Sequence, residues 1–166
     1  MWPVVQSILD TISGRSRKRV CAPILEKRNH FEDPNRITIL SLLADTEDRC
    51  LIDDLSSKYS WDVFFAKGWR EAYGLTDQIK PAIILFDRDV AGADWRHVVS
   101  ALASTSTAAC VLLVSRVADD YLWNEVVSNG GYDVVPKPLR EDDLVRVVRL
   151  AWSYWNGIRQ AGAMRK

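Results

Sequence analysis

The chain has 166 residues, with 22 Lys and Arg against 22 Asp and Glu, so its formal net charge is zero. This length favours a single domain, and a composition of 48% hydrophobic and 27% charged residues excludes wholesale disorder. The even charge balance argues against a dedicated nucleic-acid binder, because such proteins carry a basic surplus to offset phosphate charge.

The cysteines and the hydropathy pattern predict a cytoplasmic protein without membrane association. Cys21, Cys50 and Cys110 are odd in number, lie far apart and lack C-x-x-C spacing. This fits reduced thiols and no structural zinc site. No apolar run approaches the roughly twenty residues of a bilayer span, and the first ten residues lack the order of a secretory signal.

Residues 1–35 differ in character from the rest of the chain. Apolar residues at helical spacing from Val5 to Ile12 predict one short helix, and a basic run from Arg15 to Arg19 follows. Because this run is short and has no interleaved aromatic residues, a solvated linker is the favoured interpretation. We expect an appended arm and not a separate domain.

From Arg36 onward, short apolar runs alternate with longer stretches of helical period, which is typical of repeated βα units around a parallel sheet. The third and fourth runs are almost unbroken, as expected for central strands that helices cover on both faces. The five predicted strands are Ile37–Leu43, Asp62–Ala66, Ala82–Phe86, Cys110–Val114 and Asp133–Val135.

The helices between these strands are predicted from apolar stripes and end signals. Stripes at helical spacing run from Trp95 to Leu102 and from Leu144 to Trp155. Asp94 and Asp119 are predicted N-caps, and Gly130–Gly131 is a stop signal for the fourth helix.

Polar side chains follow four of the five predicted strands. Asp45 comes after the first strand, Asp87 after the third, Ser115 after the fourth and Lys137 after the fifth. In an open parallel sheet the carboxyl ends of the strands share one edge, where ligands bind. The sequence therefore predicts that two carboxylates, a hydroxyl and an amine converge there.

Two segments carry a resemblance to a known family. Ile84–Asp94 resembles the phosphoacceptor loop, and Gly130–Pro138 the fifth strand, of the receiver domains of two-component response regulators, the CheY-like superfamily. The resemblance covers about residues 36–156 and leaves residues 157–166 as a C-terminal tail. It implies an atypical single-domain receiver with a flavodoxin-like (βα)5 fold, a three-layer α/β sandwich around a five-stranded parallel sheet in the order 2-1-3-4-5.

The resemblance also implies a role for each strand-end residue. Asp87 would accept a phosphoryl group, and Mg²⁺ would be held by Asp45, Asp87 and the backbone carbonyl of Asp89. Lys137 would place a positive charge on the acyl phosphate, and the Ser115 hydroxyl would bond to it. These roles suit phosphoryl transfer, which needs positioning and charge neutralisation.

Several positions depart from the family pattern. Ala44 stands where a second acid is usual, which weakens the expected Mg²⁺ site. Anchoring the register on Trp61 moves Asp45 past the usual acidic pair, so the sequence leaves open whether Asp45, Glu47 or Asp48 binds the metal, or none of them. Arg116 follows Ser115 in place of a small residue, so it would crowd the phosphoryl group or lend it positive charge. Val134 stands where an aromatic switch residue is usual.

The implied function is signalling through protein contacts. Asp87 would take its phosphoryl group from a histidine kinase or phosphotransfer protein. We expect at most self-phosphorylation as a phosphoacceptor and self-dephosphorylation, with no turnover of an external substrate and no DNA-binding output domain after Trp155. The output partner would be a downstream protein or a second copy, bound through the fourth and fifth helices with Trp123, Trp152 and Trp155.

Two other functions stay open on the sequence alone. A degenerate receiver could act as an adaptor that binds proteins without phosphorylation, given the missing acid. A flavin carrier of the same topology needs a Gly- and hydroxyl-rich phosphate loop after the first strand, and the acids of residues 45–48 would repel a phosphate there.

Overall fold

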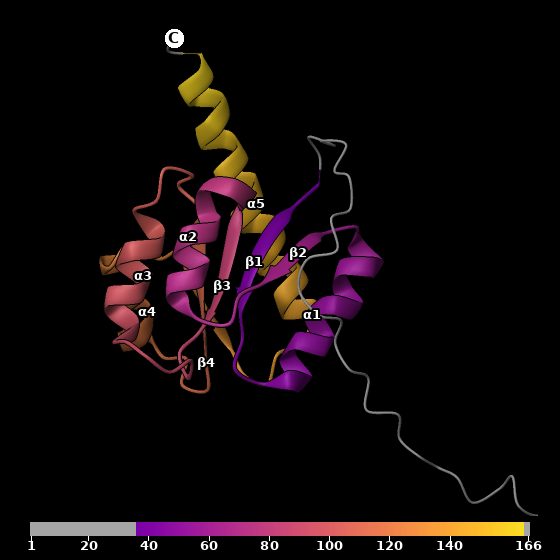
Figure 1. Ribbon diagram of the computed structural model, residues 1–166, viewed down its shortest axis with the longest axis vertical. Helices are drawn as coiled ribbons and strands as arrows, with labels where there is room; N and C mark the ends of the chain where they lie inside the picture. The colour runs from indigo at the N-terminus through magenta and orange to yellow at the C-terminus, as the bar shows by residue number, and fades with distance from the viewer. Residues whose placement is uncertain (1–35, 165–166) are drawn as a thin grey trace, which may run out of the picture.

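The computed structural model describes residues 36–164, in which strands alternate with helices (Figure 1). The strands are β1 (Thr38–Leu42), β2 (Asp62–Phe65), β3 (Ile83–Asp87), β4 (Cys110–Ser115) and β5 (Asp133–Pro136). The helices are α1 (Thr46–Tyr59), α2 (Trp69–Ile79), α3 (Trp95–Ala103), α4 (Asp120–Ser128) and α5 (Glu141–Ala163). The expected arm of residues 1–35 lies outside the described part of the chain.

The five strands form one parallel sheet in the order β2-β1-β3-β4-β5, so the expected flavodoxin-like topology is confirmed. Each strand begins and ends within about one residue of its predicted range. Every residue of β3 and β4 is buried, because helices cover both faces of the sheet at its centre.

Two apolar clusters fill the space between the sheet and its helices. Ile52 of α1 and Leu144 of α5 belong to the cluster on one face. Val98 of α3 and Leu122 of α4 belong to the cluster on the other, which α2 also joins. Side chains of successive strand residues alternate between the two clusters, as the period of a strand requires. The result is a three-layer sandwich (Figure 1).

The helix boundaries follow the signals in the sequence. Asp94 accepts a hydrogen bond from the Arg96 amide, and Asp119 accepts one from the Leu122 amide at 2.7 Å, so both predicted N-caps are confirmed. Helix α4 ends at Ser128, and Gly130 follows in a left-handed conformation with φ of 88°.

Helix α5 continues further than expected. The C-terminal tail was expected from residue 157, but the helix runs on to Ala163 and its last turns extend past the sheet (Figure 1). Its first half buries Leu144, Val148 and Ala151 against the core, whereas residues 157–163 are exposed. Across residues 36–164, no helix combines the length and the apolar character that a bilayer crossing demands.

The three tryptophans of α4 and α5 lie in different surroundings. Trp152 and Trp155 are partly buried and pack against the core cluster that contains Leu144. The Trp155 indole also donates a hydrogen bond to the Thr107 carbonyl at 3.0 Å. Only Trp123 presents a large surface, with 45% of the residue exposed. Core packing therefore accounts for two of the three residues that we expected at a protein interface.

Candidate functional site

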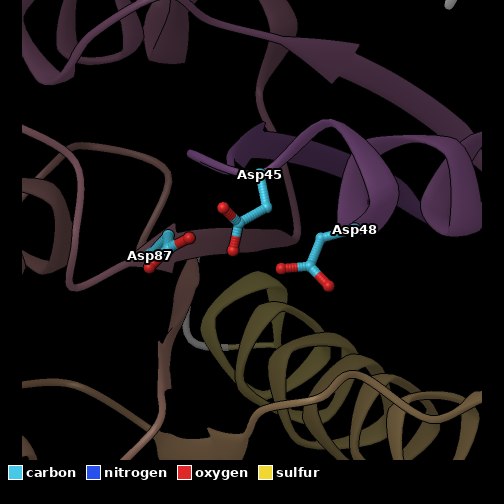
Figure 2. Close-up of side chains that lie close together, drawn as sticks. All are labelled: Asp45, Asp48 and Asp87. Carbon is cyan, nitrogen blue, oxygen red and sulfur yellow. The ribbon is translucent and has the colours of Figure 1, made fainter.

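The carboxyl ends of β1 and β3 bring Asp45, Asp48 and Asp87 into an acidic cluster (Figure 2). Lys137, which follows β5, lies beside this cluster. Asp87 is the last residue of β3, and Asp45 is the residue before α1. Asp48 lies in the first turn of α1, which returns its side chain to the same end of the sheet. The acidic cluster and Lys137 together thus join residues from three separate parts of the chain.

Lys137 holds the acidic cluster together. Its ammonium nitrogen lies 2.5 Å from Asp87 Oδ2, 2.7 Å from Asp45 Oδ2 and 3.1 Å from Asp48 Oδ2. The lysine side chain is only 5% exposed. It directly follows β5 and is joined to Pro138 by a cis peptide bond. The predicted meeting of Asp45, Asp87 and Lys137 is therefore present in the structure.

Asp87 is fixed by the backbone as well as by the lysine. Its Oδ2 accepts a hydrogen bond from the Ala44 amide at 3.1 Å, and its Oδ1 accepts one from the Asp89 amide at 3.0 Å. The residue has no exposed surface. Such bonds hold a carboxylate in one orientation, which a positioned nucleophile requires.

The acidic cluster fits a small divalent cation. Asp45, Asp48 and Asp87 each offer one oxygen, and these oxygens lie within 4.8 Å of one another. Asp48 Oδ2 is buried and lies 3.1 Å from the Lys137 ammonium, with which it forms an ion pair. Carboxylate oxygens are the ligands that Mg²⁺ prefers, and the cluster offers three of them close together.

Asp48 joins the acidic cluster and Glu47 does not. The sequence left open which of Asp45, Glu47 and Asp48 would lie at a metal site. Glu47 is exposed to solvent, whereas the Asp48 side chain is only 13% exposed and faces Lys137. Residues three apart in a helix lie on one face, so Asp45 before the helix and Asp48 within it approach the same point.

The electrostatics of the site favour full ionisation of Lys137 and Asp45. Burial works against the charged form of Lys137, but hydrogen bonds to Asp45 and Asp87 and contact with Asp48 outweigh it and raise the lysine pKa. The hydrogen bond from Lys137 lowers the pKa of Asp45, with a smaller contribution from Arg116. Both groups are therefore charged at neutral pH.

Ser115 lies at the same end of the sheet but has a different partner. It is the last residue of β4 and is nearly fully buried. Its hydroxyl oxygen accepts a hydrogen bond from the Val117 amide at 3.2 Å, which leaves the hydroxyl proton available to another acceptor. Val134, in place of an aromatic residue, packs against the core cluster that contains Val98.

Arg116 links two acids beside the site. Its guanidinium lies 2.9 Å from Asp89 Oδ2 and 3.5 Å from Asp45 Oδ2. The sequence suggested either crowding or added positive charge at this position, and it could not identify these partners because they lie in two other loops. Asp89 thus contributes its side chain to an ion pair, while a role for its carbonyl stays a prediction.

Comparison with known proteins places the fold. No protein-family model matches the chain, and no curated protein matches its sequence. Solved structures do match: chemotaxis protein CheY4 of Vibrio cholerae has a TM-score of 0.64 at 15% identity, covering 70% of this chain and 98% of that chain. The receiver domain of Francisella response regulator 1452 has a TM-score of 0.64 at 18% identity, covering 72% of this chain and 98% of that one.

A two-component response regulator from Clostridium difficile has a TM-score of 0.63 at 17% identity, covering 70% of this chain and 95% of that chain. The three structures share the receiver-domain fold with this chain. The fold that the resemblance implied is therefore confirmed.

Proposed function

We propose that this protein is a phosphoryl-accepting signalling domain of the two-component type, with Asp87 as the acceptor. The observation that carries the proposal is the set of ion pairs that Lys137 forms with the acidic cluster at the carboxyl ends of the strands. In this arrangement a carboxylate can act as the nucleophile, and the lysine supplies positive charge for the phosphoryl group.

In the proposed reaction an Asp87 oxygen attacks the phosphorus of a phosphohistidine on a kinase or phosphotransfer protein. The phosphorus–nitrogen bond breaks as the phosphorus–oxygen bond forms, and the leaving imidazole keeps the electron pair and takes a proton from solvent. Oδ1 is the better candidate nucleophile, because it accepts one backbone bond, whereas Oδ2 is held by both Lys137 and Ala44.

Asp45, Asp48 and Asp87 would hold Mg²⁺, which when bound neutralises charge on the phosphoryl oxygens. Lys137 would shift from the carboxylates to the new phosphoryl group, since a compact ammonium on a flexible stem can follow the charge. The Ser115 hydroxyl would donate its available proton to a phosphoryl oxygen. The exchange takes place in the cytoplasm under this proposal.

The test is intact-mass analysis after incubation with Mg²⁺ and acetyl phosphate. The wild type should gain the mass of one phosphoryl group, and Asp87→Asn should gain none because an amide oxygen does not form the acyl phosphate. Asp94→Asn is the matched control: Asp94 caps α3, asparagine caps equally well, and this variant should be modified like the wild type. An unmodified wild type with every phosphoryl donor would contradict the proposal.

A phosphorylation-independent adaptor is the second candidate. It is favoured by the complete burial of Asp87 and by the large exposed apolar side chains Tyr121 and Trp123 on α4. This function predicts that Asp87→Asn binds the protein partner as tightly as the wild type does, whereas a phosphoryl switch predicts that the affinity changes on phosphorylation of the wild type alone.

A further inference from the structure

We infer that Arg116 is a built-in counter-cation that competes with a divalent metal ion for Asp45 and so sets the metal affinity of the acidic cluster. The inference rests on the proposed function, because it concerns the regulation of the same site. It starts from a feature of this chain: a long basic side chain reaches from the end of β4 to acids that follow β1 and β3.

Arg116 and Lys137 meet at a single oxygen atom. Asp45 Oδ2 lies 2.7 Å from the Lys137 ammonium and 3.5 Å from the Arg116 guanidinium. The other end of the guanidinium is anchored on Asp89 Oδ2 at 2.9 Å. A candidate metal-ligand oxygen is thus already shared by two cations.

A metal ion that takes Asp45 must displace at least one of these contacts. Lys137 is nearly buried and also contacts Asp48 and Asp87, so without a phosphoryl group to receive it, leaving Asp45 would cost it several charged contacts. The Arg116 side chain is 67% exposed and can keep Asp89 or turn into solvent. Arg116 is therefore the cation that yields.

The exposure of Arg116 also limits how much this residue weakens metal binding. Solvent-exposed ion pairs contribute little, so the arginine imposes a modest cost on metal binding and does not block it. Its charge additionally weakens the local field that attracts a divalent cation. Removal of the side chain should therefore tighten Mg²⁺ binding by about two- to fivefold.

Isothermal titration calorimetry with Mg²⁺ alone tests this inference on the full chain. Arg116→Ala should bind about two- to fivefold more tightly than the wild type, and the difference should shrink as monovalent salt screens the ion pairs. Arg146→Ala is the matched control, since Arg146 is a similarly exposed arginine paired with Asp143 on α5, and its Mg²⁺ affinity should equal that of the wild type.

An unchanged or weaker affinity in Arg116→Ala would overturn the inference, and so would the absence of binding in both proteins. Phosphoryl-adduct formation, measured on the same preparations, separates the two proposals. An adduct on Asp87 with no effect of Arg116→Ala on metal affinity leaves the proposed function standing and removes the inference. Tighter Mg²⁺ binding in Arg116→Ala without an adduct in any variant removes the proposed function and leaves the role of Arg116 in metal affinity standing.

Discussion

Asp48 joins the acidic cluster from the first turn of a helix. Helix α1 begins at Thr46, directly after Asp45, so its first turn carries Asp48 back toward Lys137 and Asp87. Its side chain is only 13% exposed and lies with Asp45 and Asp87 in the acidic cluster. We therefore expect the carboxylate of Asp48 to matter more for cation binding than that of its neighbour Glu47, which is exposed.

Asp48→Asn should weaken Mg²⁺ binding by at least about tenfold, because the variant loses one negative ligand of a cation that prefers carboxylates. Glu47→Gln removes the same charge one residue away and should change the affinity by less than about twofold. Calorimetric titration of both variants with Mg²⁺ measures the difference. Equal losses in the two variants would show that general charge, and not ligation by Asp48, attracts the ion.

The sequence predicted that Asp45, Asp87 and Lys137 lie close together, because the end of a parallel strand is a position that the hydrophobic pattern defines well. It left Asp48 undecided because the first residue of a helix decides which later side chain turns inward, and helix starts are the least certain part of a pattern. The partners of Arg116 could not be predicted either, since they depend on the relative positions of three loops.

The link between α4 and β5 shows how closely an element boundary is packed. A Cβ atom at Gly131 would lie 2.5 Å from Val126 Cγ1 and 3.1 Å from Val99 Cγ1. Both valines are buried in the same core cluster, so neither can move without disturbing its neighbours. This close approach accounts for glycine at the position.

Gly131→Ala should lower the free energy of unfolding by about 1–3 kcal/mol, the cost typical of overpacking. Gly157→Ala is the control: it adds the same methyl group in the exposed part of α5, where nothing lies within 4 Å, and should raise stability by about 0.5–1 kcal/mol through helix propensity. Urea unfolding followed by circular dichroism measures both values. A neutral or stabilising effect at Gly131 would contradict the packing argument.

The strands were predictable as elements because β3 and β4 carry unbroken apolar runs, whereas the end of α5 was not. The apolar stripe stops near Trp155, the last residue that packs on the core, but the chain beyond it still favours a helix and contains no proline. An apolar stripe ends where the helix leaves the core, but the helix itself can continue. The apolar pattern therefore marked the last residue that packs on the core and not the last residue of α5.

The whole molecule has an apolar layer on each face of a single sheet. Leu55 of α1 lies in one layer and Leu102 of α3 in the other, and both are almost completely buried. Because the two layers share the strands between them, neither can persist when the sheet is lost. We expect one cooperative unfolding transition for residues 36–164.

Leu55→Ala and Leu102→Ala should each lower the free energy of unfolding by about 2–5 kcal/mol. Far-UV circular dichroism and tryptophan fluorescence should report the same urea midpoint within each variant, and the double variant should show the sum of the single effects, since the two sites contact opposite faces. Separate midpoints for the two probes in either variant would indicate that one layer unfolds alone.

The borders of the sheet carry a last consequence. Its outermost strands, β2 and β5, have four residues each, and β5 finishes at Pro136, which offers no amide hydrogen to an incoming chain. A neighbouring molecule would find only a brief, interrupted row of donors and acceptors there. Concentrated samples should therefore resist fibre growth by strand addition, even though the interior of the sheet is strongly apolar.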